Sequence, residues 1–220
     1  FGFESEGVTT NNSKSLWVGG GYSLFGFNIR SDKSYEYKRN SISLSHSQSL
    51  HKNFDLFYNF SFGKSSWVNE YYYLSDPSRT YSEDKSATEF DFSLGIRYHL
   101  PFELSNSILR TVSPFVSAEL GYELWSGDQM VDIPGTSFSY TAAGDIWQWQ
   151  IKLGAELFLL NKFSLIPHFN YISKLNSEID PYTMYGADLV YFLNRRFGLR
   201  AGYMLGSDKT NLDLSVVVAW

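Results

Sequence analysis

Six ionisable residues are the first candidates for chemistry, because they recur at one height on six consecutive predicted strands. They are Arg97, Glu119, Glu156, His168, Asp188 and Arg200. A belt of opposite charges inside a pore can select ions or support catalysis. Buried charges are costly unless they are paired, so the same belt also suits a salt-bridge network that fills an interior. We expect the network rather than a catalytic cluster.

The other charged and histidine residues give weaker signals. Glu123 and Lys152 form a second candidate pair, which we expect across one hairpin and again in a structural role. The four histidines lie on separate predicted strands or turns, without the spacing of a nucleophile, base and carboxylate. No His, Asp or Glu spacing is typical of a metal site. We therefore expect no catalytic residue, no metal, no cofactor and no enzyme activity.

The backbone that positions these residues is indicated by a period of two. The stretch SISLSHSQSL, Ser41 to Leu50, has serine at every odd position and mostly apolar residues at even positions. Only a β-strand sends successive side chains to opposite faces. The same pattern predicts ten strands, and no window supports an amphipathic helix. Their ranges are 16–28, 35–49, 54–68, 87–100, 114–126, 144–160, 163–175, 182–193, 197–206 and 211–220.

The two faces of these strands differ strongly in size and polarity. One face carries large apolar residues such as Phe60, Leu94, Leu153 and Val216, and the other carries small, polar or charged residues. About forty large side chains would not fit inside a barrel of roughly ten strands, because eight strands are already nearly filled by ordinary side chains. The apolar face must therefore point outward, towards lipid. This size argument disfavours a soluble lipocalin-like barrel, in which the apolar face would point inward.

Composition is compatible with this all-β, single-domain interpretation over residues 1–220. The formal net charge of −5 argues against a nucleic-acid partner, and there is no cysteine for disulfides. No run of eighteen apolar residues predicts a membrane helix, whereas spanning strands need only about nine to eleven residues. The start at Phe1 fits a mature exported protein whose signal has been removed.

The connections suggest an orientation for a closed antiparallel barrel of ten strands, with eight as the alternative. The two long connections, 69–86 and 127–143, match external loops, and the short ones match periplasmic turns. Both termini would then be periplasmic, with 1–15 a short periplasmic segment. Aromatic girdles are expected at Trp67 and Tyr71 to Tyr73 above, and at Phe54, Phe163, Phe192, Phe197 and Trp220 below. Tyr71, Tyr72 and Tyr73 also suit contact with a partner.

The end of the chain resembles a known assembly signal. The terminal LDLSVVVAW alternates apolar residues and ends in an aromatic, with Leu214, Val216, Val218 and Trp220 on one face. It is similar to the C-terminal signal of bacterial outer-membrane barrels. The chain as a whole resembles the small outer-membrane β-barrel superfamily, the porin-like group of OmpW, OmpX and OmpA barrels, and its composition is similar to Bacteroidetes-type members. The resemblance implies a Gram-negative outer-membrane location, with outer-membrane lipid and the barrel-assembly machinery as partners.

Three function classes remain open at this point. The first is a structural or interaction component with a filled lumen that docks envelope proteins through 69–86, 127–143 or the periplasmic segment 101–113. The second is a narrow passive channel for small solutes, and the third is an embedded lipid-modifying enzyme. Fold alone does not choose among them. The filled lumen favours the first class.

Overall fold

The computed structural model describes most of the chain, in ten stretches. These are residues 23–34, 37–51, 53–73, 76–100, 109–133, 136–159, 163–176, 180–193, 197–207 and 209–219. Ten β-strands lie in them: β1 Ser23–Ser34, β2 Tyr37–His51, β3 Phe54–Tyr73, β4 Asp76–His99, β5 Leu109–Ile133, β6 Thr136–Leu159, β7 Phe163–Lys174, β8 Tyr182–Phe192, β9 Phe197–Gly206 and β10 Lys209–Ala219. Among the described residues, no helix is long and apolar enough to span a membrane.

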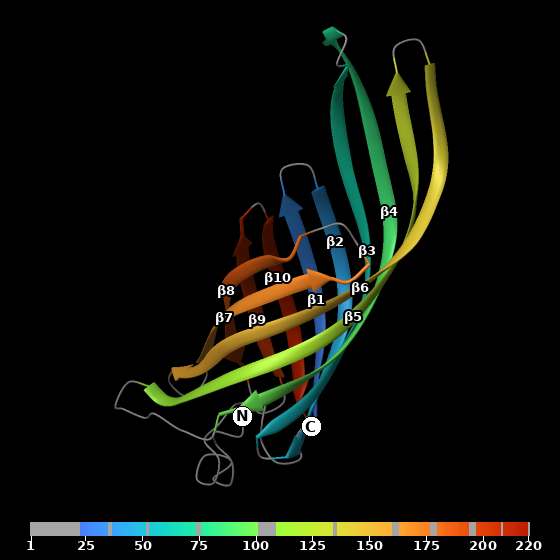
Figure 1. Cartoon of the computed structure of the whole chain (residues 1–220). Coiled ribbons are helices and arrows are strands. Elements are labelled where there is room, and N and C mark those ends of the chain that lie inside the picture. The colour runs from blue at the N-terminus through green and yellow to red at the C-terminus, as the bar shows by residue number, and fades with distance from the viewer. Residues whose placement is uncertain are drawn as a thin grey trace.

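The ten strands close into one antiparallel barrel (Figure 1). Each strand pairs with its neighbours in the sequence, and β1 pairs with β10 from Leu24↔Ala219 to Ser34↔Lys209. Closure leaves no sheet edge within the barrel wall. The predicted all-β barrel of ten strands is confirmed, and the alternative of eight strands is wrong. The expected segment 1–15 and the predicted start of the first strand at Leu16 lie outside the described residues.

The direction of the two faces follows the alternation in the sequence. Phe60, Leu94, Leu153 and Val216 are all 44 to 51% exposed and point away from the lumen. The intervening residues, for example Ser61 and Ser93, are buried on the inner face. The expectation that the apolar face points outward is therefore confirmed. The small inner residues leave room for the longer charged side chains that share the lumen.

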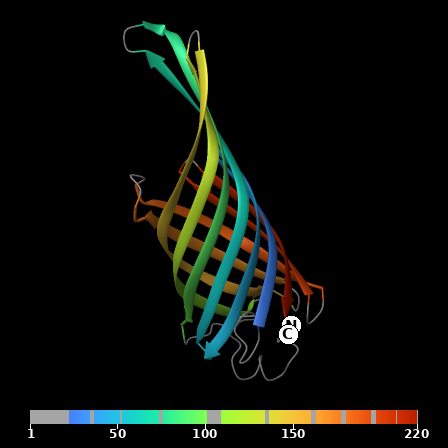
Figure 2. The ribbon, with the colours of Figure 1, turned by 90° about the vertical axis from the view of Figure 1, so that its right-hand side faces the viewer.

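Four neighbouring strands rise far beyond the rest of the barrel (Figures 1 and 2). We call this projecting sheet the extension: residues 68–73 of β3, 76–86 of β4, 127–133 of β5 and 136–147 of β6. The predicted loops at 69–86 and 127–143 are therefore wrong, because both are paired hairpins with rungs such as Tyr71↔Tyr81 and Gln129↔Tyr140. Polar residues on both faces of these segments hide the alternation that marks the barrel strands.

Large inward aromatic residues pack on glycines of the neighbouring strand. A Cβ atom on Gly95 would lie 2.4 Å from the Phe57 ring, and one on Gly154 would lie 2.6 Å from the Phe115 ring. Each aromatic faces its glycine directly across the ladder, so the missing side chain provides the space for the ring. Among the described residues, the inner face shows this arrangement at Phe57↔Gly95, Phe115↔Gly154, Trp125↔Gly144 and Phe192↔Gly198.

Aromatic pairs mark both borders of the outer apolar band. Tyr122 with Trp147 and Trp149 with Tyr171 lie near the extension, at ring separations of 4.6 and 5.3 Å. Phe54 with Tyr98 and Phe163 with Tyr191 lie at the opposite end, which we call the base, both at 4.8 Å. The predicted girdles are thus partly wrong. Trp67 and Phe192 lie on the inward register. Tyr71 to Tyr73 belong to the strand β3 within the extension, and Trp220 lies outside the described residues.

Candidate functional site: a filled lumen

An apolar cluster occupies the lumen near the base. Phe115 on β5, Phe158 on β6 and Phe192 on β8 are at most 9% exposed. They form one buried cluster, which we call the plug, together with Ile166, Val190 and Val217. The six residues come from five strands around the wall, so their side chains meet inside the barrel. The sequence interpretation assigned the filling of the lumen to the charge belt and did not predict the plug.

A charge layer lies directly above the plug, centred on Asp188 of β8. Its Oδ2 atom is 3.1 Å from Nη2 of Arg200 and 3.9 Å from Nδ1 of His168. The His168 Nδ1–H donates to the carbonyl oxygen of Ile166 at 3.1 Å. Gly202 faces Asp188 across the ladder, and a Cβ atom there would come within 2.3 Å of Asp188 Oδ1. The absent side chain of Gly202 therefore makes room for the carboxylate.

The other predicted belt residues are dispersed. The Arg97 guanidinium lies over the rings of Phe115 and Phe57, 4.8 and 5.7 Å from their centroids. Such a cation–π contact stabilises a desolvated arginine. Glu119 is half-buried on the inner face. Glu156 accepts a 3.3 Å hydrogen bond from Ser164 and lies nearer the base. The structure thus brings together three of the six belt residues: His168, Asp188 and Arg200.

The predicted pair of Glu123 and Lys152 is separated. The turn of the β5–β6 hairpin sets the register from Ile133↔Thr136 downward, so Glu123 faces Ile146 and Lys152 faces Ser117. Lys152 interacts electrostatically with Asp188 and Arg200, and more weakly with Arg97 and Glu119, so it joins the layer around Asp188. Two residues on facing strands meet only when their register matches, and the sequence interpretation had not assigned this register.

A second charge layer lies where the barrel meets the extension, and its core was not predicted. Arg39 on β2 forms ion pairs with Glu89, at 2.7 Å, and with Asp91, both on β4. Ser61 donates to Asp91 at 2.8 Å, and Ser65 donates to Glu89. Glu123 interacts electrostatically with Asp91, Glu89 and Arg39, and also with Lys174. The sequence signal for this layer is that Arg39 lies on the same inward strand face as Ser41, and Glu89 on the same inward face as Asp91.

A buried Asp–His–Ser chain joins three strands at the base. His99 Nε2 is 3.1 Å from Asp55 Oδ2, and His99 Nδ1 is 3.2 Å from Ser113 Oγ. A carboxylate only accepts hydrogen bonds, so the Nε2–H donates to Asp55 and the Ser113 hydroxyl donates to Nδ1. The three side chains are 0 to 1% exposed, so no substrate reaches Ser113 Oγ in this arrangement. These two hydrogen bonds therefore link β3, β4 and β5 in a buried position.

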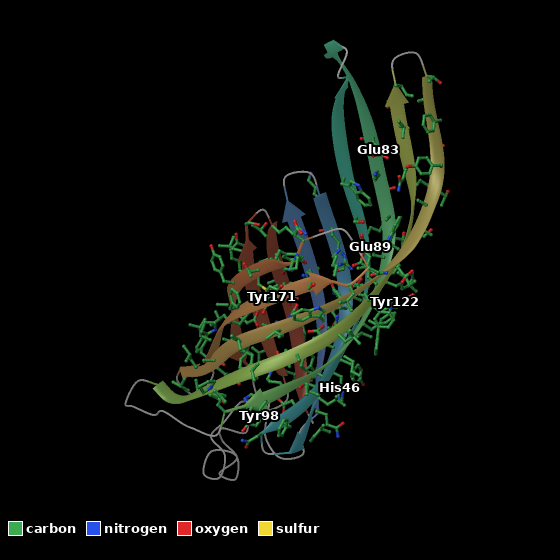
Figure 3. All side chains as sticks on the ribbon, in the orientation of Figure 1. His46, Glu83, Glu89, Tyr98, Tyr122 and Tyr171 are labelled. Carbon is green, nitrogen blue, oxygen red and sulfur yellow. The ribbon has the colours of Figure 1, made fainter. Side chains whose placement is uncertain are left out.

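The remaining predicted residues are placed as follows. Leu214 and Val216 point outward on β10, Val218 is half-buried, and Trp220 lies outside the described residues. Of segment 101–113, residues 101–108 lie outside the described part and β5 begins at Leu109. Within the described residues, no group of three His, Asp or Glu side chains is placed to hold a metal ion. Figure 3 shows that Glu83 lies on the extension, with Glu89 below it.

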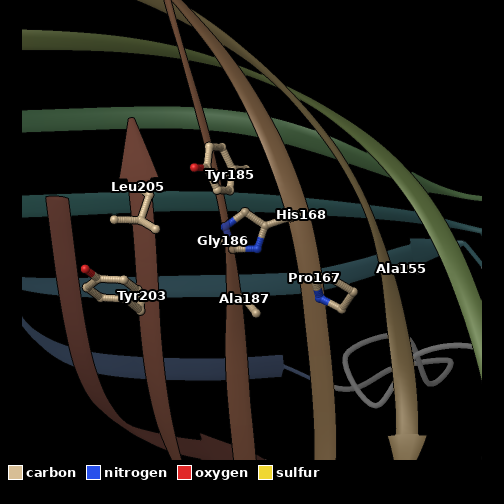
Figure 4. Close-up of a pocket in the computed structure, with 8 residues that line it drawn as sticks. All are labelled: Ala155, Pro167, His168, Tyr185, Gly186, Ala187, Tyr203 and Leu205. Atoms are coloured by element: carbon tan, nitrogen blue, oxygen red, sulfur yellow. The ribbon is translucent and has the colours of Figure 1, made fainter. Parts of the chain in front are cut away.

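A groove crosses the barrel wall over β6 to β9 (Figure 4). Its outward-facing floor has small side chains at Ala155, Pro167 and Ala187, and Tyr185 and Tyr203 stand beside them. His168 also lines it, but the Nε2 atom of this ring is buried. The groove therefore offers an apolar surface and no acid–base pair that a substrate can reach.

Comparison with known proteins supports the fold assignment. No family model matches the chain, and no curated protein matches it in sequence. The translocator domain of the autotransporter NalP from Neisseria meningitidis is similar in structure, with a TM-score of 0.57 and 11% identity over 99% of this chain and 94% of that one.

Two further solved structures match with lower scores. An outer membrane channel from Pseudomonas putida F1 has a TM-score of 0.47 at 11% identity, covering 96% of this chain and 98% of that chain. The attachment invasion locus protein Ail of Yersinia pestis has a TM-score of 0.37 at 11% identity, over 92% of this chain and all of that one. With the closed ten-stranded barrel and the likeness to the NalP translocator, the expected resemblance is confirmed at the level of the fold: this chain has the fold of an outer-membrane β-barrel.

Proposed function

We propose that the protein is an integral component of a bacterial outer membrane, with a closed lumen, that anchors the extension at the cell surface for contact with a partner. The observation that carries this proposal is the set of buried side chains inside the barrel. The plug lies near the base, and two charge layers lie above the plug. A barrel filled in this way offers a rigid anchor rather than a path for solutes.

The outer surface supports the membrane location. The outward side chains of the barrel strands are apolar between the two aromatic borders, which is the pattern of a lipid-facing wall. Beyond the upper border the outward residues become polar, as at Ser66, Asp84 and Asp128. An extension with such a surface belongs in water. We therefore propose that the extension lies outside the cell and that the base of the barrel faces the periplasm.

The filled lumen also separates the proposed function from its alternatives. A passive channel needs a continuous wet path, and the six buried apolar side chains of the plug favour a lumen without one. A lipid-modifying enzyme needs a nucleophile that a substrate can reach, and Ser113 Oγ is buried with its His99 and Asp55 partners. The extension instead supplies a paired sheet outside the barrel wall. Contact through this paired sheet replaces the loop contacts that the sequence suggested.

Single-channel recording in planar bilayers tests the closed lumen. We expect no conductance steps from the wild type, and steps from a variant in which Phe115, Phe158 and Phe192 are all replaced by alanine. The matched control replaces the outward Phe60, Phe92 and Phe169, which leaves the plug intact. Heat-modifiable gel mobility verifies that each variant is folded. Steps from the wild type would favour the narrow channel instead.

A second variant separates the plug from the charges above it. The double substitution Arg97→Ala and Arg200→Ala removes two cations of the lumen and leaves the plug in place. We expect this variant to stay closed, because the apolar side chains still fill the base. Conductance from this variant together with silence from the triple phenylalanine variant would identify the charges, not the plug, as the obstruction.

A further inference from the structure

We propose that the free edge of β6 in the extension binds an extended segment of a partner protein, which adds to the sheet as a further strand. The inference rests on the proposed function, because it names the site and the chemistry of the partner contact. The edge comprises residues 136–145 of β6, and we call it the β6 edge. Strand addition is an established mode of peptide recognition, in which main-chain hydrogen bonds supply the affinity.

The β6 edge has no neighbouring strand within the described residues. β6 pairs with β5 along its whole length, down from Ile133↔Thr136. On its other side, pairing with β7 begins only at Gln148↔Lys174. Figures 1 and 2 show the β6 arm of the extension standing clear of β7 and β8. Ten residues of β6 are thus paired on one side alone.

Just below and at the lower end of this edge, Leu175 and Asn176 form hydrogen bonds with the main-chain groups of Trp147 and Asp145. Leu175 N–H donates to the carbonyl oxygen of Trp147 at 2.7 Å. The Asn176 side chain continues the ladder, since its Oδ1 accepts from Trp147 N–H at 2.7 Å and its Nδ2 donates to the carbonyl oxygen of Asp145 at 3.0 Å. An asparagine side chain here occupies the place of a strand. Within the described residues, no such substitute follows above Asp145.

These contacts also show which main-chain groups are directed outward. Trp147 and Asp145 use their main-chain groups on the side away from β5, and the direction alternates along a strand. The β5–β6 register has no irregularity above Thr111, so the odd-numbered residues keep this direction. The N–H and C=O groups of Ser137, Ser139, Thr141 and Ala143 therefore point to the free side, while the even residues bond to β5.

The side chains of the β6 edge define the chemistry of the partner. Natural edge strands are often protected by lysine, proline or a bulge, and residues 136–144 contain none of these and no charge. On the lumen-side face, Phe138 and Tyr140 are 50 and 45% exposed. On the opposite face Thr141 donates to Asp128 at 2.9 Å, and Asp145 is exposed. The fitting partner alternates apolar residues, which cover the rings, with basic residues, which meet the carboxylates.

A synthetic peptide tests the inference on the full chain folded in lipid nanodiscs. The probe is a fluorescent ten-residue peptide of alternating valine and lysine, and its binding is followed by anisotropy. We expect Ser139→Pro combined with Ala143→Pro to weaken binding at least tenfold, because both outward N–H donors are lost while the ladder to β5 is kept. Ser139→Ala combined with Ala143→Ser keeps the donors and serves as the control.

Further measurements make the outcome specific to strand addition. The same peptide with N-methyl groups on alternate residues should not bind, and an alternating valine and glutamate peptide should bind more weakly than the lysine form. Amide exchange at Ser139, Thr141 and Ala143 should slow when the probe is bound. Equal binding by the proline variant, or unchanged exchange at these amides, would overturn the inference.

A second copy of this chain is the competing occupant. Disulfide cross-linking of a Thr141→Cys variant in native membranes, giving a homodimer that the two prolines abolish, would overturn the assignment to a partner protein. The proposed closed lumen is tested separately by conductance. An open pore would therefore refute the proposed function without affecting the peptide experiment, and the absence of peptide binding would leave the closed barrel in place.

Discussion

Gly202→Ala is expected to destabilise the barrel by displacing the carboxylate of Asp188, which faces Gly202 across the β8–β9 ladder. The added Cβ atom would lie 2.3 Å from Asp188 Oδ1, a separation that real structures do not tolerate. The Asp188 side chain must rotate, and its 3.1 Å contact with Arg200 Nη2 is then lost. The backbone around Gly202 needs no change, because the clashing atom is the end of a side chain.

The size of the effect follows from this one contact. A hydrogen bond between charged groups contributes about 1.5 to 3 kcal/mol to stability. The Arg200 side chain is 30% exposed, so solvent screening places the loss near the lower half of that range, at about 2 kcal/mol. Since 1.4 kcal/mol is a factor of ten, the folding equilibrium constant should fall about 30-fold.

Urea unfolding in phospholipid vesicles, followed by tryptophan fluorescence, measures this change. Asp188→Ala is the second arm of a double-mutant cycle, because without the carboxylate the added methyl group meets no oxygen. We expect Gly202→Ala to cost less than about 0.5 kcal/mol in that background. Gly206→Ala on the same strand and face is the matched control, since its nearest contact is 3.3 Å. An equal cost of Gly202→Ala with and without Asp188 would refute the reasoning.

Three further predictions concern the upper charge layer, assembly and the outer face. Arg39→Met should destabilise the barrel by about 3 to 5 kcal/mol, because Glu89 and Asp91 lose their cation in a largely buried site; urea unfolding of this variant, with the exposed Lys64→Met as control, measures it. Trp220→Ala should lower the amount of heat-modifiable, membrane-inserted barrel without lowering synthesis, and normal insertion would contradict the terminal assembly signal. Spin labels at Phe60, Leu94, Leu153 and Val216 should be relaxed by lipid-soluble oxygen rather than by a water-soluble nickel chelate, and the reverse would contradict the lipid-facing wall.

The barrel itself could be predicted from the sequence because one physical rule acts on every strand. Alternation assigns each side chain to one of two faces, as it does for Phe60 and Ser61 on β3. Side-chain volume then assigns the bulky face to the outside, because the lumen cannot hold it. Ten strands, their antiparallel order and the lipid-like outer face all follow from these two local properties.

The extension could not be recognised in the same way. Its β4 segment carries polar residues on both faces, Glu83 and Lys85 on one and Asp84 and Ser86 on the other, because both faces meet water. The alternation that indicates a half-buried strand is therefore weak there, and the segments read as loops. Only the hairpin pairing in the structure shows that they continue β3 to β6, and only the missing β7 partner leaves the β6 edge free.

The contacts inside the lumen were decided by the tertiary structure alone. The sequence determined that Glu123, Lys152, Asp55 and His99 face inward, since their parity on the strand is local information. Their partners depend on the register between strands, and His99 meets a residue 44 positions away in Asp55. A shift of two residues in register changes every such pair while each side chain keeps its face. For this reason the sequence alone determined the wall and its polarity, whereas the plug, the two charge layers and the buried Asp55–His99–Ser113 chain required closure of the barrel in one register.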